Sequence, residues 1–161
     1  MKKSAFITIG ALVAFAAVNT ASAQSATQTV TFQVTAINQI AVTGTPSLVI
    51  NTASAGTAPT AATSSGNTWS VTTNQTGASI TASIPTAMPT GVTLSANLTA
   101  PSGATSTGLT SLGTTAVNVV TGITKLNASG LALGYQLDAT AAAGVVSSAT
   151  RVVTFTITGG V

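Results

Sequence analysis

The sequence contains no cysteine, no histidine and a single acidic residue, Asp138. General acid–base catalysis needs a histidine, or a pair of carboxylates, that titrates near the working pH. Zinc sites need histidine or cysteine ligands, and calcium sites prefer several carboxylates. We therefore expect a protein that is not an enzyme and that binds no metal and no cofactor. The lack of cysteine also means that no disulfide stabilises the fold.

One catalytic arrangement survives this inventory, a serine nucleophile with Lys125 as its base. A reactive lysine must be desolvated, because burial is what lowers its pKa. Lys125 lies in a polar stretch between Ile123 and Gly130, and nothing in its flanks indicates burial. We expect Lys125, Arg151 and Asp138 to be ordinary surface charges.

Charge of either sign is scarce, since only 3% of the residues are charged whereas a typical domain has about a quarter. Without residues 1–23, which hold Lys2 and Lys3, the charges are Lys125, Arg151 and Asp138, and two positive minus one negative gives +1. Nucleic-acid binding needs clustered lysine and arginine, which this chain lacks. A nearly neutral surface is poorly protected against self-association, because net charge normally keeps molecules apart.

The first 23 residues have the order of a secretory signal peptide. Lys2 and Lys3 precede an apolar run over residues 5–18, and Ala21-Ser22-Ala23 supplies a small-residue cleavage pattern before Gln24. The alternative is a retained N-terminal anchor, but the run is shorter than the roughly 20 residues of a membrane span. No second long apolar run follows. We expect a bacterial protein that is secreted or displayed at the cell surface, with no membrane span after cleavage.

Residues 24–161 are long enough for one domain with a single core. Apolar and polar side chains alternate with period two, and helical spacing is nearly absent. The pattern predicts an all-β fold, an antiparallel β-sandwich of about seven to nine strands. The expected strands cover residues 29–35, 40–42, 48–50, 69–73, 80–84, 92–98, 109–123, 131–137 and 153–157.

The expected core anchors are aromatic. Trp69 heads an alternating strand, which is typical of a core residue in a sandwich, although a surface tryptophan could instead stack on a sugar. Tyr135 and Phe155 are expected to pair in a C-terminal hairpin, and residues 69–73 and 80–84 in another hairpin through residues 74–77. The remaining predicted core residues are Leu94, Leu133, Leu137 and Ile157.

The C-terminal region carries a family resemblance, over residues 134–140, 142–144, 147–148 and 153–158. These segments resemble the last hairpin of bacterial secreted Ig-like domains. The resemblance implies an Ig-like sandwich used for display or adhesion. Ala141 and Val145 stand where such domains often have an acidic residue and an asparagine, so the resemblance does not carry a calcium site to this chain.

Residues 24–36 form a candidate assembly strand. Val30, Phe32 and Val34 alternate with threonine and glutamine, and the segment has neither charge nor proline to stop it from pairing with other strands. Residues 29–35 also resemble residues 152–158. The segment is either the first strand of its own domain or a strand exchanged between subunits. In both cases Val30, Phe32 and Val34 should face a core.

Three functions from different classes fit these observations. The leading hypothesis is a self-assembling structural subunit of an extracellular fibre, pilus or surface layer, whose partner is a second copy of itself. The alternative is a monomeric adhesin or carbohydrate-binding module with a glycan or surface target. A third, an ice-binding protein, rests only on the threonine rank of Thr154, Thr156 and Thr158.

Overall fold

Alternating apolar and hydroxyl side chains form antiparallel strands in the computed structural model, which describes residues 22–161. One compact unit covers Val34–Val161, and the residues up to Gln33 form a separate unit. Residues 22–33 adopt neither helix nor strand. The predicted signal peptide lies almost wholly outside the described residues, because the description begins at Ser22.

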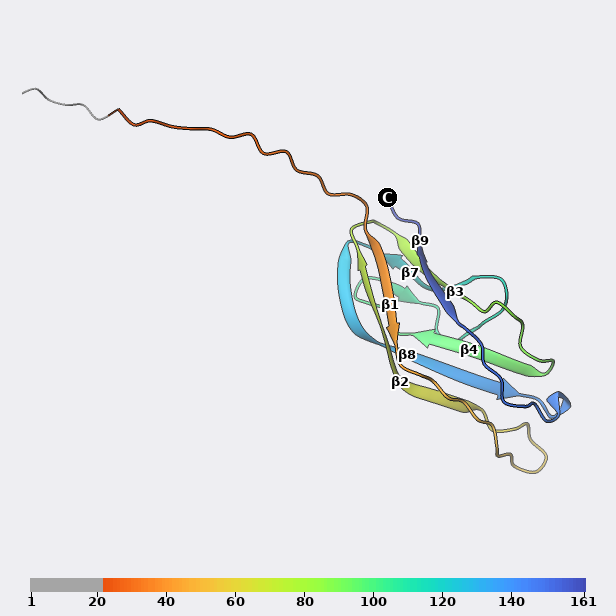
Figure 1. The fold of residues 1–161 in the computed structure, drawn as a ribbon. Helices are drawn as coiled ribbons and strands as arrows, with labels where there is room; N and C mark the ends of the chain where they lie inside the picture. The colour runs from red at the N-terminus through yellow and green to blue at the C-terminus, as the bar shows by residue number, and fades with distance from the viewer. Residues whose placement is uncertain (1–21) are drawn as a thin grey trace, which may run out of the picture. The chain divides into compact units, whose positions relative to one another are not determined.

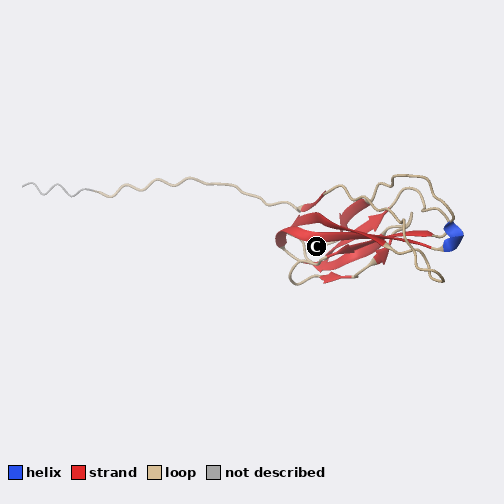
Figure 2. Ribbon diagram, turned by 90° about the horizontal axis from the view of Figure 1, so that it is seen from below, coloured by secondary structure: helices blue, strands red, loops and turns tan. Residues whose placement is uncertain are grey.

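The described residues contain nine strands, a number within the predicted range of about seven to nine. Their bounds are β1 Asn38–Thr43, β2 Ala62–Thr73, β3 Ala78–Ser83, β4 Val92–Leu98, β5 Thr105–Ser106, β6 Thr110–Ser111, β7 Val117–Ile123, β8 Leu126–Ala139 and β9 Thr154–Thr158. The one helical element among residues 22–161 is a single 3-10 turn, Ala141–Ala143, at one end of the sheets (Figure 2). None of the helical structure described from Ser22 onward is long and apolar enough to cross a membrane.

Two antiparallel sheets face each other across one hydrophobic core (Figure 1). The first has the strand order β1-β2-β8-β4-β6, and the second has the order β5-β7-β3-β9. Both contribute alternate side chains to the same cluster, in which Trp69 comes from the first sheet and Ile80 from the second. The predicted all-β class is therefore confirmed, and the two layers form a sandwich.

Most of the predicted core is found where the alternation placed it. Trp69, Leu94, Leu133 and Tyr135 are buried, whereas Leu137, Phe155 and Ile157 are half-buried and lie against the core. Trp69 is fully enclosed, and its indole Nε1 donates a hydrogen bond to the carbonyl of Thr99 at 3.2 Å. Its polar atom is therefore satisfied even though the ring has left water.

Both predicted hairpins are wrong. β2 pairs with β1 and β8, while β3 pairs with β7 and β9, so residues 74–77 cross from one sheet to the other. β8 lies between β2 and β4, whereas β9 pairs with β3 in the other sheet, so Tyr135 and Phe155 are not partners. β2 already has a neighbour on both edges, and so does β8. β2 therefore has no free edge for β3, and β8 has none for β9, which were the partners predicted from the sequence.

Two of the predicted strands are absent. Residues 29–35 form no strand, and Val30, Phe32 and Val34 are 73%, 88% and 78% exposed rather than facing a core. Residues 48–50 alternate in burial, with Leu48 and Ile50 half-buried and Val49 exposed, but join no ladder. Alternation favours a strand only where a neighbouring edge completes its hydrogen bonds. Among the described residues neither segment has such a neighbour.

Candidate functional site

The most distinctive feature of the sandwich is one open side. Within the described part of the chain, β1 is bonded only to β2 and β9 only to β3, so each sheet ends in a strand of five or six residues. These two edge strands lie against each other (Figure 1). The opposite edges, β5 and β6, are only two residues long. Short edges offer little backbone for another strand to pair with, whereas long ones offer a row of unpaired N–H and C=O groups.

Neither long edge carries the usual protection against added strands. Natural edges are blunted by charged side chains, prolines or bulges. β1 reads Asn-Gln-Ile-Ala-Val-Thr and β9 reads Thr-Phe-Thr-Ile-Thr, with no charge and no proline in either. The pairing of β1 with β2 and of β9 with β3 is continuous, without a bulge. The open side is thus chemically able to accept a further strand.

An apolar groove runs between the two edges. Its lining residues are Ile40, Ala41, Val42, Val153 and Phe155. The groove is small, with a volume of about 90 Å³. Val42 remains 47% exposed at its mouth. Covering half-exposed apolar side chains with a partner is favourable, because it removes apolar surface from water.

Two asparagines fix the end of the open side where β1 begins. Asn38 Oδ1 accepts a hydrogen bond from Thr73 Oγ1 at 2.6 Å, and Asn38 Nδ2 donates to the carbonyl of Gly159 at 3.4 Å. These bonds join β1 to the end of β2 and to the chain just after β9. Asn74 adds a second set of bonds, to Thr35 and Ile37. We call these bonds of Asn38 and Asn74 the anchor of β1. The alternation of apolar residues, from which the strands were predicted, gives no information about such side-chain bonds, so the sequence did not indicate this role for either asparagine.

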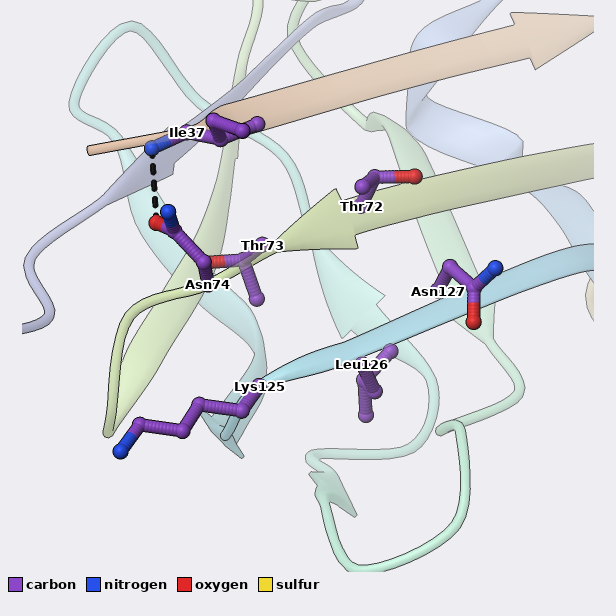
Figure 3. Close-up of a pocket in the computed structure, with 7 residues that line it drawn as sticks. All are labelled: Ile37, Thr72, Thr73, Asn74, Lys125, Leu126 and Asn127. Atoms are coloured by element: carbon purple, nitrogen blue, oxygen red, sulfur yellow. Dashed lines mark hydrogen bonds between the residues drawn. The ribbon is translucent and has the colours of Figure 1, made fainter. Parts of the chain in front are cut away.

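A larger hollow of about 370 Å³ lies beside the same anchor (Figure 3). Its lining residues are Ile37, Thr72, Thr73, Asn74, Lys125, Leu126 and Asn127. Lys125 supplies its one charge and is exposed, with its backbone N–H donating to the carbonyl of Gln75. None of the lining residues is a serine or an acid, so the hollow does not bring together the serine–lysine pair considered from the sequence.

The two remaining charged side chains, Asp138 and Arg151, each have hydrogen-bond partners of their own. Gln136 Nε2 donates to both carboxylate oxygens of Asp138, each at 3.0 Å. The guanidinium of Arg151 donates to the carbonyls of Thr150 and Ala87, at 2.9 and 3.2 Å. Asp138 and Arg151 therefore bond to different groups, and residues 22–161 contain no group of three or more His, Cys, Asp or Glu side chains that could hold a metal ion.

Burial has one effect on the titration of the core. It raises the pKa of the Tyr135 hydroxyl above its ordinary value of 10.0, because the phenolate would lose its hydration. The phenol therefore stays neutral at physiological pH and acts as a core side chain rather than as a base.

No protein-family model, curated protein or solved structure matches the chain.

Proposed function

We propose that this protein is a secreted, non-enzymatic structural subunit that assembles with copies of itself into an extracellular fibre, pilus or surface layer. In this proposal residues 1–23 are a signal peptide, and the sandwich is an Ig-like domain at the bacterial cell surface. The observation that carries the proposal is the open side, where two long, uncharged edge strands flank an apolar groove. A monomeric protein would be expected to protect such edges.

Two further features support self-association over a binding module. The described residues contain only three charged side chains, Lys125, Asp138 and Arg151, so little electrostatic repulsion opposes contact between copies. Trp69, the one tryptophan available to stack on a sugar, is fully buried. The adhesin alternative therefore loses the residue on which it chiefly depended.

The test uses protein purified from its own culture medium. Size-exclusion chromatography with light scattering, over a hundredfold range of concentration, should reveal polymers, and negative-stain electron microscopy should show fibres or sheets with a regular repeat. Mass spectrometry of the same sample should find Gln24 at the N-terminus. A protein that remains a monodisperse monomer under all these conditions would contradict the proposal.

A further inference from the structure

The exposed segment before β1 has the side-chain order of β9. Residues 29–35 and 152–158 are identical at four of seven positions, with Val30, Thr31, Phe32 and Thr35 matching Val153, Thr154, Phe155 and Thr158. In β9 the apolar members of this row lie against the core, while the threonines between them are exposed. The row of Val30, Phe32 and Val34 is therefore suited to the same environment, although in this chain it is exposed.

The free edge of β9 can receive such a row. Among residues 22–161 its backbone is bonded on one side only, to β3. The groove beside it is lined by Ile40, Val42 and Phe155 and contains no charged residue. Arg151 is the charged residue nearest to β9 in sequence. Its two terminal nitrogens donate to backbone carbonyls, whereas its buried Nε has no hydrogen-bond partner among the described residues. An uncharged strand with three apolar side chains on one face complements this edge in both hydrogen bonding and polarity.

The strand is expected to come from another molecule because the segment lacks the means to fold back. Tight reversals are built chiefly from glycine, proline, asparagine, aspartate and serine. Residues 25–43 contain no glycine, proline or aspartate, and the side chain of Asn38 is already bonded to Thr73 and Gly159. Asn74 also holds the backbone of both Thr35 and Ile37, which fixes the chain on either side of Ala36.

We propose that residues 29–35 of one molecule form a strand on the free edge of β9 in a second molecule, with Val30, Phe32 and Val34 entering the groove between β9 and β1. This inference rests on the proposed function and names the contact by which the subunits join. The apolar residues that line this groove are then covered by the entering side chains. Thr29, Thr31 and Gln33 then remain in solvent.

The lack of cysteine allows a direct test by disulfide trapping in the full-length protein. Thr31→Cys in one sample is mixed with Thr156→Cys in another under mild oxidation, and mass spectrometry counts the peptides joined between chains. Thr105→Cys is the matched control, because Thr105 is an exposed threonine on β5, the opposite edge of the same sheet. The pair of positions 31 and 156 should join at least tenfold more often than the pair of positions 31 and 105.

A charge tests the same contact without a crosslink. Phe32→Asp would bring a carboxylate into the apolar groove, whereas Gln33→Asp places the same charge on the adjacent, solvent-facing position. Phe32→Asp should lower polymer yield at least tenfold, and Gln33→Asp should leave it within about twofold. Both positions are exposed in this chain, so the melting temperature of either monomer should equal that of the wild type.

The outcomes separate this inference from the proposed function. Polymers that form equally well with Phe32→Asp, or equal trapping at positions 156 and 105, overturn the strand exchange while leaving self-assembly intact. A disulfide formed within a single chain carrying both Thr31→Cys and Thr156→Cys likewise overturns it, because the strand then completes its own domain. A wild-type protein that never associates overturns both.

Discussion

The side chain of Asn74 extends the pairing of β1 with β2 by one step beyond its last partner residues. Asn74 Oδ1 accepts the backbone N–H of Ile37 at 2.8 Å, and the backbone N–H of Asn74 donates to the carbonyl of Ile37 at 3.2 Å. Asn74 Nδ2 also donates to the carbonyl of Thr35 at 2.7 Å. Thr35 is thus the residue furthest before β1 that Asn74 binds. It directly follows Val34, the last residue of the apolar row of Val30, Phe32 and Val34.

Replacing Asn74 should loosen this anchor. Each hydrogen bond contributes a net 0.5–1.5 kcal/mol or so. Asn74→Ala removes the two by which the side chain holds Thr35 and Ile37, together with a third that its Oδ1 accepts from Gln75 Nε2. We expect the free energy of unfolding, measured in urea, to fall by about 1–2 kcal/mol. Asn118→Ala, at an exposed asparagine on β7, is the matched control and should change little.

Amide hydrogen exchange can separate the two bonds of Asn74. Asn74→Asp keeps an acceptor for Ile37 and removes the donor to Thr35, so the Ile37 amide should remain protected in this variant. The same amide should exchange faster in Asn74→Ala. Equal exchange at Ile37 in the wild type and in Asn74→Ala would show that the side chain does not hold β1.

Truncating Trp69 should unfold the domain or abolish its secretion. Removing a large buried aromatic side chain costs about 3–5 kcal/mol, a large part of the 5–15 kcal/mol or so by which domains are stable. Phe32→Ala is the contrasting control, since Phe32 is 88% exposed in the single chain and its loss should leave the melting temperature of the monomer unchanged. Equal stability of Trp69→Ala and the wild type, by thermal unfolding, would contradict the placement of the indole in the core.

The core could be predicted from the sequence because burial follows local alternation. Trp69, Val71 and Thr73 share one face of β2 whatever the strand pairs with, and all three are buried. Strand pairing is a different matter. The segment Asn74-Gln75-Thr76-Gly77 is equally compatible with a hairpin and with a crossing between sheets, because both arrangements point the apolar rows at one core.

The candidate site was predictable only in part, because the local sequence indicates apolar rows but not which strands pair. The apolar row of Val30, Phe32 and Val34 is visible in the sequence, but whether it has a partner in its own chain depends on distant strands. The groove lies between β1 and β9 because both are edge strands. Whether a strand is at an edge depends on how all the other strands pair, which the local sequence does not determine. Bonds such as that of Asn38 to Gly159 span 121 positions and leave no local pattern.

Calcium and chelators should leave the melting temperature unmoved. A ligand that binds only the native state must raise it, and the chain has one carboxylate, whose two oxygens both accept from Gln136. Differential scanning fluorimetry with millimolar calcium, and separately with EDTA, measures this directly. A calcium-dependent rise of several degrees would reveal a site built from backbone carbonyls near Asp138.

Stability should fall in strongly alkaline solution because of Tyr135. Its pKa is raised in the folded protein, so the folded state holds the phenol proton more tightly than the unfolded state does. This contribution is complete below about pH 10, the ordinary pKa of tyrosine, and is lost as the pH rises through the folded pKa. In urea titrations at pH 8 to 11, Tyr135→Phe should show a smaller alkaline decline than the wild type. Parallel declines would show that the Tyr135 phenol does not cause the effect.

Two glycines, both with positive φ, allow the cost of backbone strain to be distinguished from the cost of a steric clash. Gly44, directly after β1, has φ +111°, and Gly56 has φ +82°, so alanine is strained at both. Only at Gly44 would the added methyl overlap another residue, the side chain of Asn67 on β2, whereas the space around Gly56 is open. Asn67 is buried and donates from Nδ2 to Ser64 Oγ at 3.0 Å, so it cannot move freely.

Gly44→Ala should therefore destabilise the domain more than Gly56→Ala does. Strain at positive φ costs both variants about 1 kcal/mol or more, and the overlap should cost Gly44→Ala a further 1–3 kcal/mol or so. A double-mutant cycle with Asn67→Ala identifies the cause, because removing the asparagine should abolish that excess and give a coupling energy of similar size. If the costs of Gly44→Ala and Asn67→Ala are simply additive in urea unfolding, the close approach of Gly44 to Asn67 does not determine where β1 ends.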